Sequence, residues 1–270
     1  MTSILQLQSI GKSFYDQKAK KEIPILHNIN LEVFPHEIVC VVGTSGSGKT
    51  SLLNGIGGFS HFTSGHVFFE GKPLGDCNRD RGVVFQDYPL SEFLTALENI
   101  ALGLDFASMT FLEQLCTFTK TKRRRNLDEA TWFLNEVELG EHGHKYPREL
   151  SGGQRQRVAI AQALATKPKI LLMDEPFSGL DANTRETLQK LLLRVHKDLK
   201  NTIFYVTHDL EEAVLLGDRV IVLAPSREKH SSQGSTIVYQ ETLDQHTSAT
   251  KDSAEFITTV KRLREFIKKL

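Results

Sequence analysis

A glycine-rich loop at residues 43–50 constrains this chain more than any other stretch. It reads G-T-S-G-S-G-K-T and directly follows the apolar run Ile38–Val42. Because glycine has no Cβ, the backbone N–H groups of such a loop can turn inward around phosphate oxygens. The pattern predicts a strand, a phosphate-binding loop and a helix in succession, with the positive end of the helix dipole directed at the same anion.

The side chains of this loop indicate a nucleoside triphosphate and Mg²⁺. Lys49 is placed to reach the β- and γ-phosphates, and the Thr50 hydroxyl is placed to bind the metal ion. The loop alone predicts an NTPase, which is a very broad class. The residues expected to bind the nucleotide here are Gly43, Thr44, Ser45, Gly46, Ser47, Gly48, Lys49, Thr50 and Ser51.

Composition limits where such a protein can work. The 33 basic and 33 acidic residues give no overall field that would draw the chain onto nucleic acid or an acidic membrane. No apolar run approaches the ~18 residues that span a bilayer, and the N-terminus lacks the pattern of a secretory leader. We therefore expect a chain that is neither integral to the membrane nor secreted. Cys40, Cys77 and Cys116 fit reduced, inert thiols.

Hydrophobic periodicity divides the rest of the chain. Alternation in Ile4–Ile10 and Ile29–Val33 predicts an antiparallel layer, and residues 89–165 have helical periodicity, including a helix around Phe111–Leu115. We expect Arg219–Leu223 to close the sheet and Thr236–Tyr239 to form an edge strand.

Two segments are left with alternatives, a basic run at 120–125 and an amphipathic helix at 254–270. Each is interpreted first as an ordinary part of its own domain, and second as a contact with lipid or a partner. The apolar face of that helix is expected to contain Phe256, Ile257, Val260, Leu263, Ile267 and Leu270.

A second glycine-rich turn lies at Leu150–Gln154, with the sequence L-S-G-G-Q. Ser151 is well placed to cap the helix that follows. Two adjacent glycines at a helix start also expose backbone N–H groups, which makes a second candidate anion site.

Polar residues follow buried strands at three further points. The run Ile170–Met173 delivers Asp174 and Glu175 to the carboxyl end of a strand, where ligands of open α/β sheets bind. Asp174 is expected to hold Mg²⁺, and Glu175 to polarise the attacking water. His208 and Gln86 also follow predicted strands and are candidates by position.

The combination and order of these elements resembles the nucleotide-binding subunit of ABC transporters over residues 3–245. Phe14 falls where that family carries its adenine-stacking aromatic, with Tyr15 as the alternative. The matching motifs are Walker A at 43–50, the Q-loop at Gln86, the signature at 150–154, Walker B with its catalytic glutamate at 170–175, the D-loop at 178–181 and the switch histidine at His208.

The resemblance implies an α/β fold: a P-loop NTPase (RecA-like) core with a mostly parallel sheet, an N-terminal antiparallel β-subdomain and an inserted α-helical subdomain. It implies an ATPase domain at 1–245, with a helical subdomain at about 89–165, and a C-terminal helical extension at 246–270. It also implies a head-to-tail dimer that holds ATP between the Walker A loop of one subunit and the signature of the other. The implied roles are catalysis by Lys49, Gln86, Glu175 and His208, Mg²⁺ binding by Thr50, Gln86 and Asp174, and nucleotide contacts from Phe14, Ser151, Gly152, Gly153, Gln154 and Asp181.

Within the family, the chain looks like the nitrate, sulfonate and taurine importer branch, on segments such as 172–177 and 207–213. This implies peripheral attachment to the cytoplasmic face of the inner membrane. The implied partners are a transmembrane permease, a second ATPase subunit (a copy or a close homologue) and a periplasmic or extracellular substrate-binding protein; no nucleic acid is expected. The alternatives are a soluble ABC-type ATPase acting on ribosomes or nucleic acid, and a non-transporting regulatory partner. Two departures are His36, where glycine is common, and a longer link at 104–129.

Overall fold

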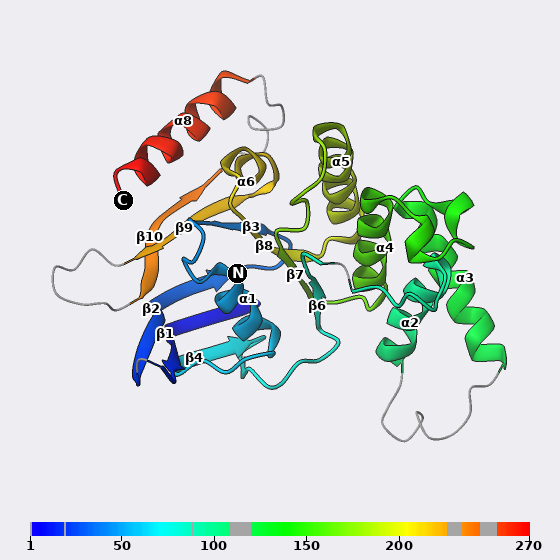
Figure 1. Ribbon diagram of the computed structural model, residues 1–270, viewed down its shortest axis with the longest axis horizontal. Coiled ribbons are helices and arrows are strands. Elements are labelled where there is room, and N and C mark those ends of the chain that lie inside the picture. The colour runs from blue at the N-terminus through cyan, green and yellow to red at the C-terminus, as the bar shows by residue number, and fades with distance from the viewer. Residues whose placement is uncertain (1, 19, 88, 109–119, 226–233, 244–252) are drawn as a thin grey trace. The chain divides into compact units, whose positions relative to one another are not determined.

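The computed structural model describes residues 2–18, 20–87, 89–108, 120–225, 234–243 and 253–270, which form two compact units (Figure 1). The first unit comprises Met1–Cys77, Leu172–Glu175 and Thr202–Leu270, and the second comprises Asn78–Leu171 and Pro176–Asn201. Cys116 and the helix predicted around 111–115 lie outside the described residues.

The first unit is built on a mixed sheet. Its strands lie in the order β5-β4-β1-β2-β10-β9-β3-β8, with the end of β7 beside β8. The strands are β1 (Leu5–Asp16), β2 (Lys21–Val33), β3 (Ile38–Val42), β4 (Ser64–Phe69), β5 (Lys72–Pro73), β7 (Ile170–Asp174), β8 (Thr202–Thr207), β9 (Arg219–Pro225) and β10 (Ser235–Thr242). The helices of this unit are α1 (Lys49–Gly57), α6 (Leu210–Leu216) and α8 (Ala254–Lys268).

The two halves of this sheet follow from two sequence patterns. β1 and β2 alternate apolar and polar residues and pair antiparallel, with Leu5 opposite Val33 and Leu7 opposite Leu31. β3 is apolar throughout, and all five of its residues are buried. It lies between β8 and β9 and is parallel to both, as expected for a strand covered on both faces. The predicted antiparallel layer and parallel core are therefore confirmed.

Two predictions about the ends of this sheet are wrong. Residues 236–239 belong to β10, which is not an edge strand, because it pairs antiparallel with β9 and parallel with β2 through Ser235 and Leu26. β9 does not close the sheet either, because β10 and β3 lie on its two sides. The error arises because β10 is the strand that joins the antiparallel part to the parallel part, and strand neighbours far apart in the sequence leave no local pattern.

The C-terminal helix α8 packs on its own unit, beside α6 (Figure 1). Phe256, Val260 and Leu263 are buried, which confirms the interpretation of docking within the domain. Ile257 and Leu270 do not share this buried face, since their side chains are 56% and 40% exposed. Ile257 is turned by about 100° from its neighbour Phe256, and Leu270 follows the end of α8 at Lys268. Across the described residues, no helix has the length and apolar character needed to cross a membrane.

The second unit is mainly helical. It contains β6 (Arg81–Val84), α2 (Ala96–Ser108), α3 (Lys120–Glu136), the 3₁₀ turns η1 (Gly140–His142) and η2 (Pro147–Glu149), α4 (Gly152–Ala165), α5 (Ala182–Leu199) and the start of β7. α2 can pack closely on α4 because Gly103 has no Cβ. A Cβ there would lie 2.5 Å from the carbonyl oxygen of Gln162. The predicted helical region is thus confirmed for its described part. The basic run at 120–125 begins α3, and its side chains lie outside the description.

Candidate nucleotide-binding and hydrolysis site

The glycine-rich loop connects β3 to α1 in the first unit, as predicted. Gly46 and Gly48 have φ angles of 81° and 87°, in the left-handed region that glycine enters without steric cost. Gly48 is also the N-cap of α1, so the loop ends at a helix N-terminus. A Cβ at Gly46 would meet nothing within 4 Å. The space beside Gly46 is therefore open for a ligand.

Gly43 is required for a different reason. A Cβ there would lie 2.4 Å from the carbonyl oxygen of Leu223 and 2.6 Å from the hydroxyl oxygen of Ser47. This glycine lets the loop leave β3 against β9 and is a packing requirement. Gly43 is therefore needed for the packing of the loop, whereas Gly46 borders the open space that the loop surrounds.

Lys49 lies folded over the loop. Its ammonium nitrogen donates to the carbonyl oxygens of Gly43 at 2.9 Å and Thr44 at 3.2 Å, and it lies 3.9 Å from Glu175 Oε1. Burial lowers the pKa of Lys49, and the carboxylates of Glu175 and then Asp174 oppose that shift. The loop therefore holds a cation whose present partners are backbone carbonyls and a carboxylate.

Asp174 ends β7 and is almost completely buried. Burial raises the pKa of its carboxyl group, while a hydrogen bond with Thr50 acts in the opposite direction. The Thr50 hydroxyl and the Asp174 carboxylate are thus adjacent oxygen donors at the first turn of α1. Mg²⁺ prefers one or two such oxygens together with phosphate oxygens, so this pair fits the metal ion that the sequence predicts.

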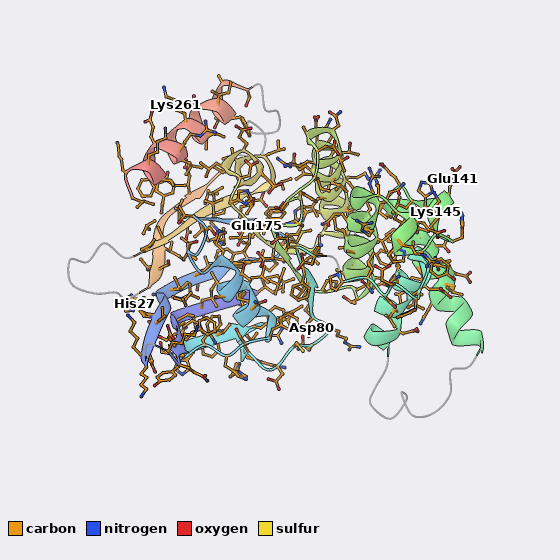
Figure 2. All side chains as sticks on the ribbon, in the orientation of Figure 1. His27, Asp80, Glu141, Lys145, Glu175 and Lys261 are labelled. Carbon is orange, nitrogen blue, oxygen red and sulfur yellow. The ribbon has the colours of Figure 1, made fainter. Side chains whose placement is uncertain are left out.

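Glu175 lies next to His208. Its Oε2 is 2.8 Å from His208 Nδ1, a hydrogen bond in which an ionised carboxylate accepts and the tautomer with a proton on Nδ1 donates. The backbone of Glu175 has a φ of 44°, uncommon for a non-glycine residue, and its N–H donates to the carbonyl oxygen of Val206 at 2.9 Å. Figure 2 shows the Glu175 side chain among the strands of the first unit. Because β7 and β8 end side by side, two residues 33 positions apart become a pair.

Two aromatic residues near the end of β1 are candidates for the predicted stacking on adenine. Phe14 is 51% exposed and Tyr15 is 63% exposed. The ammonium of Lys12 lies 5.0 Å from the centroid of the Phe14 ring, a cation–π contact on that ring. Both rings are accessible, so both stay candidates.

The remaining predicted site residues belong to the second unit. Ser151 caps α4 and forms a capping box, since its hydroxyl accepts from the Gln154 N–H and its own N–H donates to Gln154 Oε1. A Cβ at Gly153 would lie 2.4 Å from Thr184 Cγ2, so this glycine permits close packing on α5. Asp181 caps α5 by accepting from the Thr184 N–H. Hydrogen bonds from the Thr184 hydroxyl and then from the Thr184 N–H lower the pKa of Asp181.

Gln86 is exposed and follows β6 by two residues. The structure therefore brings together 43–50, Asp174, Glu175 and His208 in one unit, and it places Gln86, 151–154 and Asp181 in the other.

Comparison with known proteins decides the family. The model of the ABC transporter family matches residues 26–178, more than half of the chain. The chain belongs to the ABC transporter family. The predicted family, the P-loop NTPase fold and the ATPase class are thus confirmed.

Three relatives of this ABC protein support the same conclusion. The taurine import ATP-binding protein TauB of Pseudomonas savastanoi pv. phaseolicola is 43% identical over 83% of this chain and 80% of its own. The nitrate import ATP-binding protein NrtD of Synechococcus elongatus is 40% identical over 82% and 77%. A dimeric, post-hydrolysis ATP-binding cassette bound to ADP and Pi superposes with a TM-score of 0.72 at 33% identity, covering 89% of this chain and 99% of that one.

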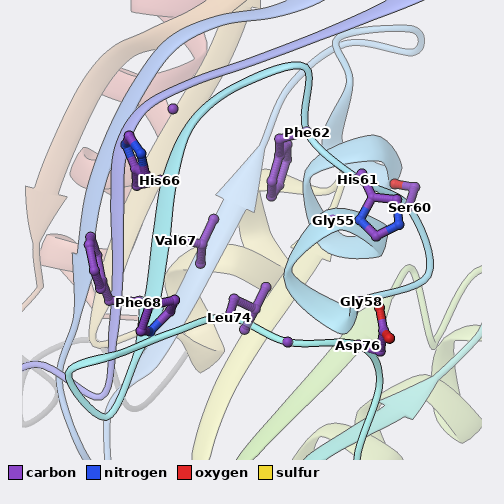
Figure 3. A pocket seen from close by; sticks show the side chains of 13 residues that line it. Gly55, Gly58, Ser60, His61, Phe62, His66, Val67, Phe68, Leu74 and Asp76 are labelled. Carbon is purple, nitrogen blue, oxygen red and sulfur yellow. The ribbon is translucent and has the colours of Figure 1, made fainter.

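Two features of this ABC chain lie outside its predicted site. A pocket of about 410 Å³ lies between the end of α1 and the β4–β5 hairpin, lined by residues that include Gly55, Phe62, His66 and Phe68 (Figure 3). None of the described residues that line it is one of the predicted site residues. The second feature is Glu212, a buried carboxylate that the sequence analysis gives no role and that binds Thr207, the residue before His208. Its signal in the sequence was only its place in the family segment 207–213.

Proposed function

We propose that this chain is the ATP-hydrolysing subunit of an importer, bound peripherally at the cytoplasmic face of the inner membrane. It works with a separate permease, a second ATPase subunit and a substrate-binding protein outside the cytoplasm. The substrate class proposed is that of nitrate, sulfonates and taurine. The observation that carries this proposal is the 40–43% identity to relatives named for taurine and nitrate import, over most of the length of each chain.

In the proposed mechanism, the loop binds the triphosphate through its backbone. Phosphate oxygens enter the open space at Gly46 and accept hydrogen bonds from the N–H groups at the start of α1. Lys49 exchanges the carbonyl oxygens of Gly43 and Thr44 for the β- and γ-phosphates. Thr50 and Asp174 would hold Mg²⁺, which would neutralise charge on the phosphate oxygens.

Hydrolysis is assigned to the pair at the ends of β7 and β8. Glu175 accepts the proton of the attacking water, and the hydrogen bond from His208 holds its carboxylate in one orientation. His208 then also lies on the γ-phosphate side of the site, and Gln86 is proposed to contact the same phosphate and the metal ion. These groups position reactants and stabilise charge, and phosphoryl transfer requires little beyond that.

The second helix N-terminus is proposed to complete the site of another subunit. At the start of α4, Ser151 is exposed and Gly152 is partly exposed, whereas Gly153 is buried. The accessible N-terminus at Ser151 and Gly152 suits the γ-phosphate of an ATP held by a second Walker A loop. Asp181 lies in the same unit, at the N-terminus of α5, where its capping bond holds it. To shift a dimer from about 99% open to 99% closed requires roughly 5.5 kcal/mol of differential binding, which two sandwiched nucleotides would supply.

Co-purification and uptake test the importer assignment. We expect the tagged full chain to be recovered from membranes with a permease, and uptake of taurine, an alkanesulfonate or nitrate to be lost in cells that carry Lys49→Ala. The exposed Lys72 provides the control variant Lys72→Ala, which should leave uptake unchanged. Recovery only with ribosomes or DNA would reject the importer in favour of the soluble alternative. Unchanged uptake of all three compounds in the Lys49→Ala cells would reject the substrate class.

A further inference from the structure

A buried carboxylate lies beneath the turn that carries His208. Glu212, in α6, is 5% exposed, and its Oε2 accepts a hydrogen bond of 2.6 Å from the hydroxyl of Thr207. Thr207 is itself buried and is the last residue of β8, directly before His208. A buried carboxylate is costly unless it is well hydrogen-bonded, so packing alone would be served better by an apolar residue at this position.

The same carboxylate also faces Tyr205, two residues earlier in β8. Burial raises the pKa of the Tyr205 phenol, and the nearby Glu212 raises it further. Consecutive side chains in a strand point to opposite faces, so Tyr205 and Thr207 both point toward α6. His208, next in the chain, extends instead to Glu175. Because Glu212 binds Thr207 on the face of β8 that is turned to α6, the next side chain, that of His208, points away from α6 and toward Glu175.

The residue after His208 is fixed by the same group of contacts. The Asp209 N–H donates to the Thr207 hydroxyl oxygen at 3.1 Å, and Asp209 Oδ1 accepts from the backbone N–H groups of Glu211 and Glu212. Thr207 and Asp209 are thus held to each other and to the first turn of α6. His208 is the residue between them, and its ring is 61% exposed, so few packing contacts orient it.

We propose that the hydrogen bond between Thr207 and Glu212 positions His208 against Glu175. Thr207 and Glu212 are then positioning residues for ATP hydrolysis. The inference rests on the proposed roles of Glu175 and His208 in hydrolysis. It assigns to Glu212 a function in the reaction without contact with the nucleotide. Loss of the bond lets the turn at 207–209 rotate, so the imidazole leaves the carboxylate that it orients.

The test uses a matched pair of variants at Thr207 in the full chain. Thr207→Val keeps the branched shape and removes the hydroxyl, whereas Thr207→Ser keeps the hydroxyl. We expect Thr207→Val to lower the kcat for ATP by about 10- to 100-fold, the size of effect that a 1 Å misplacement produces. The KM for ATP should change much less, because the Walker A loop is untouched. Thr207→Ser should restore most of the rate, and Thr207→Val should add no further loss in a His208→Ala background.

A purely structural role would give a different pattern. An equal loss from Thr207→Val in the wild-type and His208→Ala backgrounds, or a loss in Thr207→Ser as large as in Thr207→Val, would overturn the proposal. The imidazole resonances of His208, assigned by their absence in His208→Ala, provide a readout that does not depend on turnover. If they are unchanged in Thr207→Val, the positioning role is wrong. If they change as expected but the wild-type chain hydrolyses no ATP, the proposed function is the part that fails.

Discussion

The substitution Gly46→Ala, compared with Gly71→Ala, distinguishes an effect on the stability of the fold from an effect on ATP binding by the phosphate loop. Gly46 has a φ of 81° and open space where a Cβ would stand. Gly71, in the turn between β4 and β5, has a φ of 74° and equally open surroundings, and it lies outside the predicted site. Gly46→Ala and Gly71→Ala therefore impose the same backbone strain, and only Gly46→Ala places a methyl group where phosphate is expected.

The magnitudes follow from these two facts. A left-handed conformation costs a non-glycine residue roughly 1–2 kcal/mol, and the stiffer unfolded chain returns about 0.4–1 kcal/mol. Each variant should thus lose about 1 kcal/mol of unfolding free energy, or about 2–4 °C in Tm for a chain of this size. If the methyl group at Gly46 prevents one N–H from reaching a phosphate oxygen, the lost charge-assisted bond is worth about 1.5–3 kcal/mol. That loss corresponds to roughly 10- to 150-fold in ATP affinity.

Calorimetric titration with ATP and thermal unfolding, carried out on both variants and the wild type, check this prediction. Both variants should unfold at the same slightly lower temperature, and only Gly46→Ala should bind ATP more weakly. If Gly46→Ala binds ATP as tightly as Gly71→Ala, the open space at Gly46 is not the phosphate site and the reasoning is refuted.

Three other substitutions test separate parts of the account. Glu175→Gln should lower kcat by at least about 100-fold while ATP binding is retained, as measured by steady-state hydrolysis and nucleotide titration; unchanged hydrolysis would remove Glu175 as the base. Burial raises the pKa of Asp174 in the folded state, so the protonated carboxyl group favours folding. This contribution to the free energy of unfolding is present at low pH and is lost as the pH rises through the folded pKa. Asp174→Asn should therefore raise the Tm of the nucleotide-free protein at pH 7 and lose this advantage below about pH 4, near the unfolded pKa; an advantage that grows on acidification would contradict the sign. His36 has a φ of 66°, so His36→Gly should stabilise the fold by about 0.5–1 kcal/mol with hydrolysis unchanged, and a lower Tm would show that the side chain contributes more than its strain costs.

Local patterns in the sequence predicted the parts of the site that local geometry builds. The loop at 43–50 needs only its own glycines and the helix that follows. The capping serine at Ser151 depends on residues within one helical turn. The strand that ends at Asp174 is recognised from a short apolar run. These features are written in consecutive residues, so no knowledge of the tertiary fold was needed.

The features that sequence reasoning missed or could not resolve depend on strand neighbours and buried contacts. The sequence predicts an edge strand at 236–239 because the partner of β10 in β2 is about 200 residues away and leaves no local pattern. The contact of Glu175 with His208 needs the two strand ends to lie side by side, which the order of motifs implies only through the family. The bond from Thr207 to Glu212 is local in sequence, but nothing in the sequence says that this glutamate is buried.

The central claim is that each ATP is hydrolysed in a site shared by two ATPase subunits, and mixing variants of this chain tests it most directly. Lys49→Ala and Ser151→Arg homodimers should both be inactive. A mixed dimer has both defects in one site and none in the other, so mixing should restore activity. If half of the dimers are mixed and sites act independently, the recovery should be about a quarter of the wild-type rate. Differently tagged subunits confirm that mixed dimers form. If these dimers are present and hydrolyse no ATP, the shared site is contradicted.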